Sequence, residues 1–304
     1  MAVKTGIKNC DTSILGTWFE GCNITMREIA KIFLLSPKAD IDAEDPLVDA
    51  TIATLIKKGL LVPLNEILNV TEAAAKNNYQ TFANKRKLFI SQGLYEMMPD
   101  FEANICYVKA LHRLSSKSWG ALLLDVEGQL YFDRKGSKMK GFDLNTFNPD
   151  NETLNDGGSK TAALVVDMQF SADGTQGLNT RRDFKIDDTD SSRFMSILGI
   201  QNVKLTANTL AHASFVVKVV GGCDGAEPIL GLTKPNFKLV LASTGATVTL
   251  TTVTDNNDGT YTIVSGATAF PHTLQLFDSI ENLPVADVES THFYASNVLA
   301  VTLT

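Results

Sequence analysis

The segment from about residue 209 to Thr304 constrains the fold most, because it contains short alternating runs and no convincing helical stretch. Alternation of apolar and polar residues places one face of a strand in a core and the other in solvent. The runs are SFVVKVV, FKLVLA, ATVTLTTVT, GTYTIVSG, TLQLFD and VLAVTLT. Six or seven strands in about 96 residues are typical of a β-sandwich. We therefore predict an all-β sandwich domain over residues 209–304.

The first 208 residues mix helical and strand patterns. DPLVDATIATLIKKGLLVPL predicts a helix with Asp45 as its N-cap, and FEANICYVKALHRLS predicts a second helix capped by Asp100. GALLLDVEGQLYFD predicts a hairpin that turns at Glu127-Gly128, TAALVVDMQF predicts a strand, and MREIAKIFLLS is either a strand or one face of a helix. Polar stretches between residues 133 and 160 predict exposed loops. The expected class is an α+β domain, 1–208, rich in antiparallel strands with two or so helices.

Charge and hydropathy limit the partners of the chain. The formal net charge is −7 over 304 residues, which argues against nucleic acid as the main partner. Residues 209–304 contain three lysines and eight acids, so their net charge is −5, and this shift supports a boundary near residue 208. No apolar run reaches the roughly 18–20 residues of a membrane span. We expect a folded soluble protein with no membrane partner.

The four cysteines do not form a C-x-x-C pair. They are Cys10, Cys22, Cys106 and Cys223. The N-terminus lacks the basic and apolar segments of a signal peptide, so we expect a protein made in a cytosol, where thiols stay reduced. Whether Cys10 pairs with Cys22 is left open by their spacing.

The stretch TDNNDGTYTIV has two interpretations. If Gly259 is position 6 of a calcium loop, Thr254, Asn256 and Asp258 fall at ligand positions, but Ser265 stands where a bidentate acid is needed. Alternatively, Asp258 and Gly259 form a turn, and Tyr261 places its ring in the core and its hydroxyl on a backbone group. We favour this structural corner and predict no metal ion or other cofactor.

This corner also carries a family resemblance. VTDNNDGTYTI is similar to the strand-turn-Tyr segment of filamin-type and bacterial immunoglobulin-like repeats, and GLTKPNFKLV resembles the segment that precedes it. The resemblance implies an immunoglobulin-like sandwich over residues 209–304. It does not identify a partner, and no Cys…Trp…Cys pattern accompanies it.

Catalytic and metal motifs are not found. The histidines are scattered, and none has a second His or a Cys at ligand spacing; they are His112, His212, His272 and His292. Nucleophile-elbow, phosphate-loop and dinucleotide motifs are lacking. The acidic cluster at Asp40, Asp42, Glu44 and Asp45 is interpreted as a solvated helix entry. An enzyme with an acidic site near Asp125, Asp133 or Asp167 is an alternative hypothesis.

A basic cluster follows the predicted hairpin. Its members are Arg134, Lys135, Lys138 and Lys140. A nucleic-acid patch is conceivable, but an exposed loop or a subunit contact suits an acidic chain better. An acidic run contains Asp187, Asp188 and Asp190, and pairing between copies would bring the two charges together. We therefore interpret both clusters as a candidate subunit contact.

The order of elements resembles that of bacteriophage tail tube proteins. The stretch KLFISQG…GALLLDVEGQLYF…KGFDL…TAALVVDMQF, with the predicted helix FEANICYVKALHRLS between its first two segments, has the order of strand, helix, hairpin and strand. The predicted immunoglobulin-like domain follows it. The resemblance implies a non-enzymatic virion subunit, made in the host bacterial cytoplasm, that forms rings with itself and contacts other virion proteins. The C-terminal domain would project outward and touch the host surface or neighbouring proteins weakly. A connector, a capsid decoration protein or a surface-binding module that adheres to glycans or proteins is an alternative.

Overall fold

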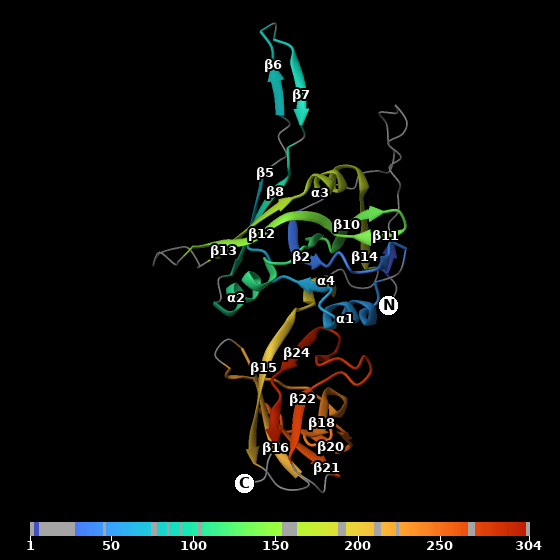
Figure 1. Cartoon of the computed structure of the whole chain (residues 1–304), viewed down its shortest axis with the longest axis vertical. Helices are drawn as coiled ribbons and strands as arrows, with labels where there is room; N and C mark the ends of the chain where they lie inside the picture. Colours follow the sequence, from blue (N-terminus) through green and yellow to red (C-terminus); the bar gives the residue numbers. More distant parts are fainter. Residues whose placement is uncertain are drawn as a thin grey trace. The chain divides into compact units, whose positions relative to one another are not determined.

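The computed structural model describes residues 3–5, 28–44, 47–73, 78–83, 85–91, 93–102, 105–153, 163–187, 193–209, 214–222, 225–266 and 271–301. Strands dominate these residues, and the helices are few and short (Figure 1). The chain divides into two compact units. The first unit comprises Met1–Val48 and Leu60–Ser196, and the second comprises Asp49–Gly59 and Ile197–Thr304.

Helix α1 (Asp49–Lys57) belongs to the second unit, although the sequence places it in the first domain. Its apolar face buries Ile52, Leu55 and Ile56. The domain boundary predicted at residue 208 falls inside β15 (Ile200–Thr209). In the structure, the two units divide between Ser196 and Ile197. The predicted cap Asp45 lies outside the described residues. A composition shift marks where strands begin to dominate, but it cannot show which core a distant helix joins.

Most strands of the first unit belong to one large sheet. Its order is β1 (Val3–Thr5), β14 (Arg182–Asp187), β10 (Gln129–Lys135), β9 (Gly120–Asp125), β12 (Phe142–Thr153), β13 (Ala163–Phe170), β8 (Glu96–Glu102) and β5 (Asn69–Ala73). β2 (Ile29–Leu35) pairs with β9 and β4 (Leu61–Pro63), and β11 (Lys138–Lys140) pairs with β10 and β3 (Ile41–Asp42). β6 (Asn78–Thr81) and β7 (Lys87–Ser91) form a separate hairpin.

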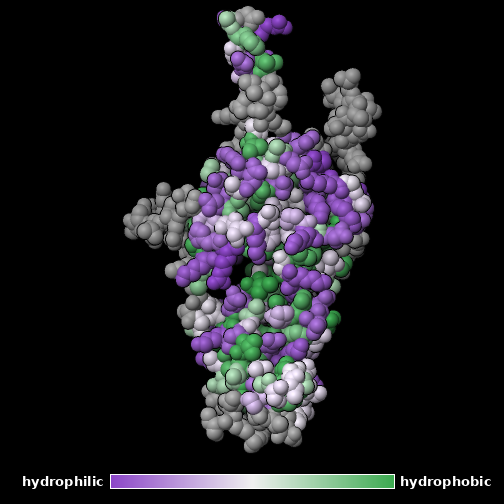
Figure 2. Space-filling model, viewed as in Figure 1, coloured by the Kyte–Doolittle hydropathy of each residue, from purple (hydrophilic) through white to green (hydrophobic). Residues whose placement is uncertain are grey.

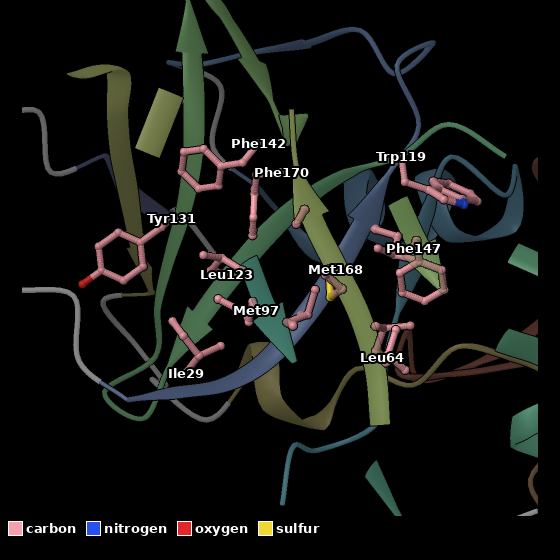
Figure 3. Packing of buried hydrophobic residues seen from close by; sticks show 14 of the residues in the cluster. Ile29, Leu64, Met97, Trp119, Leu123, Tyr131, Phe142, Phe147, Met168 and Phe170 are labelled. Atoms are coloured by element: carbon pink, nitrogen blue, oxygen red, sulfur yellow. The ribbon is translucent and has the colours of Figure 1, made fainter. Parts of the chain in front are cut away.

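The core of the first unit lies between two parts of this sheet. β9 is buried at every position, and β13 alternates so that Leu164, Val166 and Met168 point inward. Figure 3 shows Leu123, Met97, Met168 and Phe170 close together in this core. β12 joins the two parts, because it begins beside β9 and continues along β13 with register shifts at Leu144/Thr146 and Pro149/Asn151. Such bulges bend a strand from one sheet into another.

Two expectations for the first unit are corrected. The predicted helix cap Asp100 lies in β8, and α2 begins at Ile105 and ends at Leu114. The loops expected between 133 and 160 contain β11 and all of β12, a polar strand that is paired along its length on one side. The polar stretch after Phe170 forms short helices and a strand: α3 (Ala172–Gln176), the π-helix η1 (Gly177–Arg181), β14 and α4 (Arg193–Ser196). Polar composition does not exclude regular structure where long-range pairing satisfies the backbone.

The second unit has two sheets with a shared core. One has the order β20 (Leu250–Asp255), β21 (Thr260–Ser265), β16 (Ser214–Gly221), β15, β24 (His292–Ser296) and β23 (Ala286–Val288), with β17 (Glu227–Pro228) beside β16. The other has the order β19 (Thr247–Val248), β18 (Phe237–Leu241), β22 (His272–Leu276) and β25 (Leu299–Val301), preceded by the 3-10 turn η2 (Lys234–Asn236). Val217 and Ile263 from the first sheet meet Leu239 and Leu274 from the second in the same core. The pairing is antiparallel except between β15 and β24.

Candidate functional site

The buried carboxylate of Asp125 shapes a turn. Asp125 is fully buried at the end of β9. Its Oδ1 accepts hydrogen bonds from the backbone N–H groups of Glu127 (3.0 Å) and Gln129 (2.9 Å). Its Oδ2 accepts one from the Tyr131 hydroxyl at 2.9 Å. Burial, followed by this bond, raises the pKa of Tyr131. The Asp125 carboxylate therefore stabilises the β9–β10 turn. Its use as a catalytic acid or base would disturb the hydrogen bonds that form this turn.

The carboxylate of Asp133 is held in an ion-pair network. Asp133 is fully buried, and Arg181 binds both of its oxygens at 2.9 and 2.8 Å. Arg181 also contacts Asp173 at 2.8 Å, and its bond with Asp133 is the main reason that the pKa of Arg181 is raised. A Cβ at Gly177 would lie 2.7 Å from Asp133 Oδ2, so only glycine fits where η1 begins. Asp133 therefore joins β10 to η1.

The three candidate acids do not assemble one site. Asp125 lies at the β9–β10 turn, Asp133 lies toward the other end of β10, and Asp167 is exposed on β13. Among the described residues, no group of three His, Cys, Asp or Glu side chains could hold a metal ion.

The basic cluster is paired within its own unit. Arg134 binds Asp183 at 3.1 Å and also binds Glu44, Lys135 binds Asp173, and Lys138 binds Asp40 at 3.0 Å. Lys140 donates to the backbone oxygen of Ala39 at 2.6 Å. These partners come from β14, from α3 and from the segments that flank β3, not from the expected acidic run. Asp187 ends β14, whereas Asp188 and Asp190 lie outside the described residues. A contact between copies through this cluster would have to exchange existing ion pairs.

The histidines have no common role. His112 is exposed on α2, and His292 stacks near Tyr294 with ring centroids 6.5 Å apart. His272 is buried in β22, and burial lowers its pKa. His212 lies outside the described residues. In the part of the chain that the structure describes, no helix is long and apolar enough to cross a membrane.

The corner formed by Asp258, Gly259 and Tyr261 is closed by hydrogen bonds. Tyr261 is fully buried, and its hydroxyl donates to the backbone oxygen of Ile229 at 2.8 Å and accepts from Leu232 N–H at 3.3 Å. Asp258 Oδ1 accepts from the Thr260 N–H at 2.8 Å. Gly259 has a φ of 79°, and an added Cβ would lie 2.7 Å from Pro228. These bonds fix the turn between β20 and β21.

The redox expectation is wrong for one cysteine. Cys106, which is exposed on α2, is disulfide-bonded. The expectation of four reduced thiols followed from the compartment, and the compartment cannot show which cysteines the fold brings together. Cys10, Cys22 and Cys223 lie outside the described residues.

Two buried lysines escaped the sequence analysis. Lys31 on β2 is 1% exposed and donates to the backbone oxygen of Met195 at 2.7 Å. Burial lowers its pKa to about 8, against the opposing effect of Glu66. Lys57 at the end of α1 binds Asp278 and, at 2.9 Å, Asp287. The signal for Lys31 was a lysine inside the apolar run IAKIFLL, whereas nothing near Lys57 in the sequence indicates its partners.

Four neighbouring strands form a run in the order β12, β13, β8 and β5, and the two outer strands, β12 and β5, each have an edge that lacks a partner strand over most of its length among the described residues. β5 pairs with β8 alone among the described strands. β12 pairs with β13 from Leu144 to Thr153. On its other side, within the described residues, β9 pairs with Phe142 and Asp143, and the Leu144 N–H donates to Trp119 O at 3.1 Å. Backbone N–H and C=O groups along an open edge can pair with a strand of another chain.

The β6–β7 hairpin exposes apolar side chains. Tyr79, Phe82 and Leu88 are 51%, 47% and 53% exposed. Figure 2 shows hydrophobic and hydrophilic residues side by side on this hairpin. Exposed apolar groups gathered on one element commonly mark an interaction surface.

Two surface cavities of the first unit do not supply a catalytic arrangement. The larger, of about 330 Å³, is lined by Ser115, Lys117, Ser118, Trp119 and residues 144–148. The indole of Trp119 is 3% exposed and donates to Leu114 O, so it is not available for stacking on a ligand. The smaller, of about 200 Å³, includes Lys135 and Lys140, which already bind other groups.

No protein-family model matches the sequence, and no curated protein matches it. A function can therefore be proposed only from the features of the chain itself, namely its strand edges, its exposed hairpin and its ion pairs.

Proposed function

We propose that this chain is a structural, non-enzymatic subunit of a bacteriophage virion that assembles with itself into rings, as a tail tube or connector protein does. The second unit, in this proposal, is an immunoglobulin-like sandwich that contacts neighbours or the host surface. The resemblance of the sequence to tail tube proteins and to immunoglobulin-like repeats supports both statements. The structural roles of Asp125 and Asp133 favour this proposal over a hydrolase.

The observation that carries the proposal is the pair of open edges on β12 and β5. Both edges belong to the same run of four strands and lie at its opposite ends. If β5 of one copy pairs with β12 of the next, the contact is head-to-tail and leaves an open edge at each end. A repeated head-to-tail contact closes into a ring when the rotation between copies allows it. The geometry of each copy would then set the number of subunits.

Val70 offers a precise test of this pairing. Val70 lies opposite Pro99, which has no N–H, so this pair is not hydrogen-bonded and the Val70 N–H points away from β8. Val70→Pro removes that N–H from the open edge and leaves the bonds with β8 in place. Val70→Thr keeps the N–H and serves as the matched control. Thermal melting checks that both variants fold.

The experiment is negative-stain microscopy with mass photometry of the full chain. We expect rings or short tubes for the wild type and for Val70→Thr, and predominantly monomers for Val70→Pro. A wild type that stays monomeric at every concentration would contradict the proposal and favour a decoration or surface-binding role. Rings that survive Val70→Pro unchanged would show that assembly does not use the β5 edge.

A further inference from the structure

Lys57, Asp278 and Asp287 bring one amine and two carboxyl groups together in the second unit. Lys57 ends α1, and its Nζ contacts Oδ2 of Asp278 and, at 2.9 Å, Oδ2 of Asp287. The side chains of Lys57 and Asp278 are only 6% and 8% exposed, whereas that of Asp287 on β23 is 26% exposed. A primary amine is therefore held against a carboxyl group in a place from which water is largely excluded.

The other oxygen of the Asp278 carboxyl group is held by two backbone donors. Oδ1 accepts hydrogen bonds from the N–H of Ile280 at 2.8 Å and from the N–H of Glu281 at 3.2 Å. The turn is fixed by a further pair of bonds, from Asp278 N–H to Leu283 O at 2.8 Å and from Leu283 N–H to Asp278 O at 3.3 Å. Two N–H groups on one oxygen of a carboxyl carbon, with a nucleophile at the other oxygen, are the arrangement that stabilises the oxyanion of an acyl transfer.

We propose that Lys57 and Asp278 condense to an isopeptide bond after the chain has folded, and that Asp287 transfers the proton that this step requires. The new bond joins Nζ of Lys57 to Cγ of Asp278. It ties α1 covalently to a turn 221 positions further along the chain, and a crosslink that closes so long a loop stabilises the fold against unfolding. This inference does not rest on the proposed self-assembly.

The condensation releases one water molecule and needs no oxidant or reductant. Lys57 passes one proton to Oδ2 of Asp278, and the neutral amine then attacks Cγ of Asp278. The two backbone N–H groups stabilise the negative charge that develops on Oδ1. Asp287 takes a second proton from the nitrogen and passes it to Oδ2, which leaves as water while the carbonyl at Oδ1 forms again. One proton stays on the amide nitrogen, and Asp287 returns to its carboxylate form.

The ion pair limits the rate of this reaction. Burial opposes the charged forms of Lys57 and Asp278, but the hydrogen bonds of the cluster outweigh burial, so they raise the pKa of Lys57 and lower the pKa of Asp278. The neutral pair that the attack requires is therefore scarce. The bond accumulates slowly, as a single turnover, in protein that starts as the ion pair. Hydrolysis requires water to enter a site in which both reacting side chains are buried.

Intact mass spectrometry of the full chain tests the proposal. The mass is measured on freshly purified protein and again after several days at physiological temperature, and the protein is then digested and mapped. We expect a growing fraction that is lighter by one water molecule, together with a linked pair of peptides that contain Lys57 and Asp278. Trypsin does not cleave after an acylated lysine, so cleavage after Lys57 should be lost in the same fraction.

Two variants separate the covalent bond from the ion pair. Lys57→Arg keeps a cation beside the two aspartates, but a guanidinium that stays protonated is not a nucleophile, so this variant should keep its full mass. Asp287→Asn keeps the size of the side chain but cannot carry the proton, so it should slow the loss of water about a hundredfold or more. Thermal melting checks that both variants fold.

Three results would overturn the proposal. They are an unchanged mass in the wild type, an equal loss of water in Lys57→Arg, and a loss of water confined to the peptide that contains Asp278. The last result is expected when Asp278 closes on the backbone nitrogen of Ser279 to form a succinimide. Rings seen in the microscope without this bond would leave the proposed function standing, whereas the bond without rings would contradict ring assembly alone.

Discussion

Among the residues that the structure describes, Lys31 in the first unit and Lys57 in the second have buried side chains, and the two environments shift their pKa values in opposite directions. Lys57 in the second unit has a side chain that is 6% exposed and lies against the carboxylates of Asp278 and Asp287. Burial acts to lower its pKa, but the hydrogen bonds with the two aspartates outweigh burial and raise it. Lys31 in the first unit donates to a backbone carbonyl, and burial lowers its pKa to about 8. The environment in the second unit thus stabilises the charged form of its buried lysine, whereas burial in the first unit makes Lys31 lose its proton at a lower pH than an ordinary lysine does.

The difference shows what each lysine holds together. Lys57 joins α1 to two segments more than 200 residues away in the sequence, and Thr54 adds a bond to Glu281 at 3.0 Å. Lys31 joins β2 to α4, where Arg193 also donates to Leu47 O at 2.8 Å. Both lysines therefore tie distant segments of one unit, and Lys57 does so through two carboxylates. A buried pair that loses one partner leaves the other charge uncompensated.

The largest expected effect is that of Lys57→Met. The substitution keeps an apolar chain of similar length but leaves Asp278, whose side chain is 8% exposed, without its cation. We expect a loss of about 3–5 kcal/mol in the free energy of unfolding, measured with chemical denaturant. Lys58→Met is the matched control, because Lys58 is 47% exposed and lies 3.8 Å from Glu281, so its loss should be below about 1 kcal/mol. Equal losses for the two variants would contradict the interpretation.

The Lys57 pair should also govern acid stability of the second unit. The hydrogen bonds from Lys57 and from the backbone of Ile280 outweigh burial and lower the pKa of Asp278. A lowered carboxyl pKa contributes stability that is present above about pH 4, the ordinary value, and is lost as the pH falls through the folded value. Lys57→Met should therefore have a flatter stability profile below pH 4 than the wild type.

Lys31→Met should have a different outcome. Removing a charge that is costly to bury offsets the loss of the bond to Met195 O, so we expect a change within about 1 kcal/mol at pH 7. The pH dependence gives the sharper measurement. Between about pH 8 and 10.5 the folded wild type has lost the Lys31 proton while the unfolded chain keeps it, so wild-type stability rises with pH by roughly 3 kcal/mol. Lys31→Met should lack this rise; a persistent rise would assign it to another group.

Local patterns in the sequence predicted elements better than they predicted partners. The hairpin expected at Glu127-Gly128 is formed by β9 and β10, and the helical patterns gave α1 and α2, because turn residues and apolar spacing act within a few residues. The attachment of α1 to Asp278 depends on contacts across most of the chain. The pairing of Arg134 with Asp183 likewise needs β10 and β14 to be neighbours, and neither charge indicates that by itself.

The two units also differ in how each one binds the hydroxyl of a buried tyrosine, and the expected effects on stability are smaller than for Lys57. Tyr131 in the first unit donates its hydroxyl to the carboxylate of Asp125, and Tyr261 in the second donates to the backbone oxygen of Ile229. Hydrogen bonds to a charged acceptor are stronger than those to a neutral one. We expect Tyr131→Phe to cost about 2 kcal/mol and Tyr261→Phe about 1 kcal/mol in the free energy of unfolding. The reverse order, measured by denaturant titration, would show that Tyr261 depends more on its further bond from Leu232 N–H than on acceptor charge.

The smallest expected effect is that of calcium removal on the turn after β20. Asp255 Oδ1 accepts from the Asn257 N–H at 2.8 Å and its Oδ2 from the Gly231 N–H at 2.7 Å, while Asp258 Oδ1 accepts from Thr260. Calcium takes six to eight oxygen ligands, so binding would require these oxygens to leave their N–H donors. We expect the same melting temperature in excess chelator and in excess calcium. A calcium-dependent rise that Asp258→Asn abolishes would show instead that the turn opens to bind the cation, and it would make this corner, rather than the buried lysine, the controlling site of the second unit.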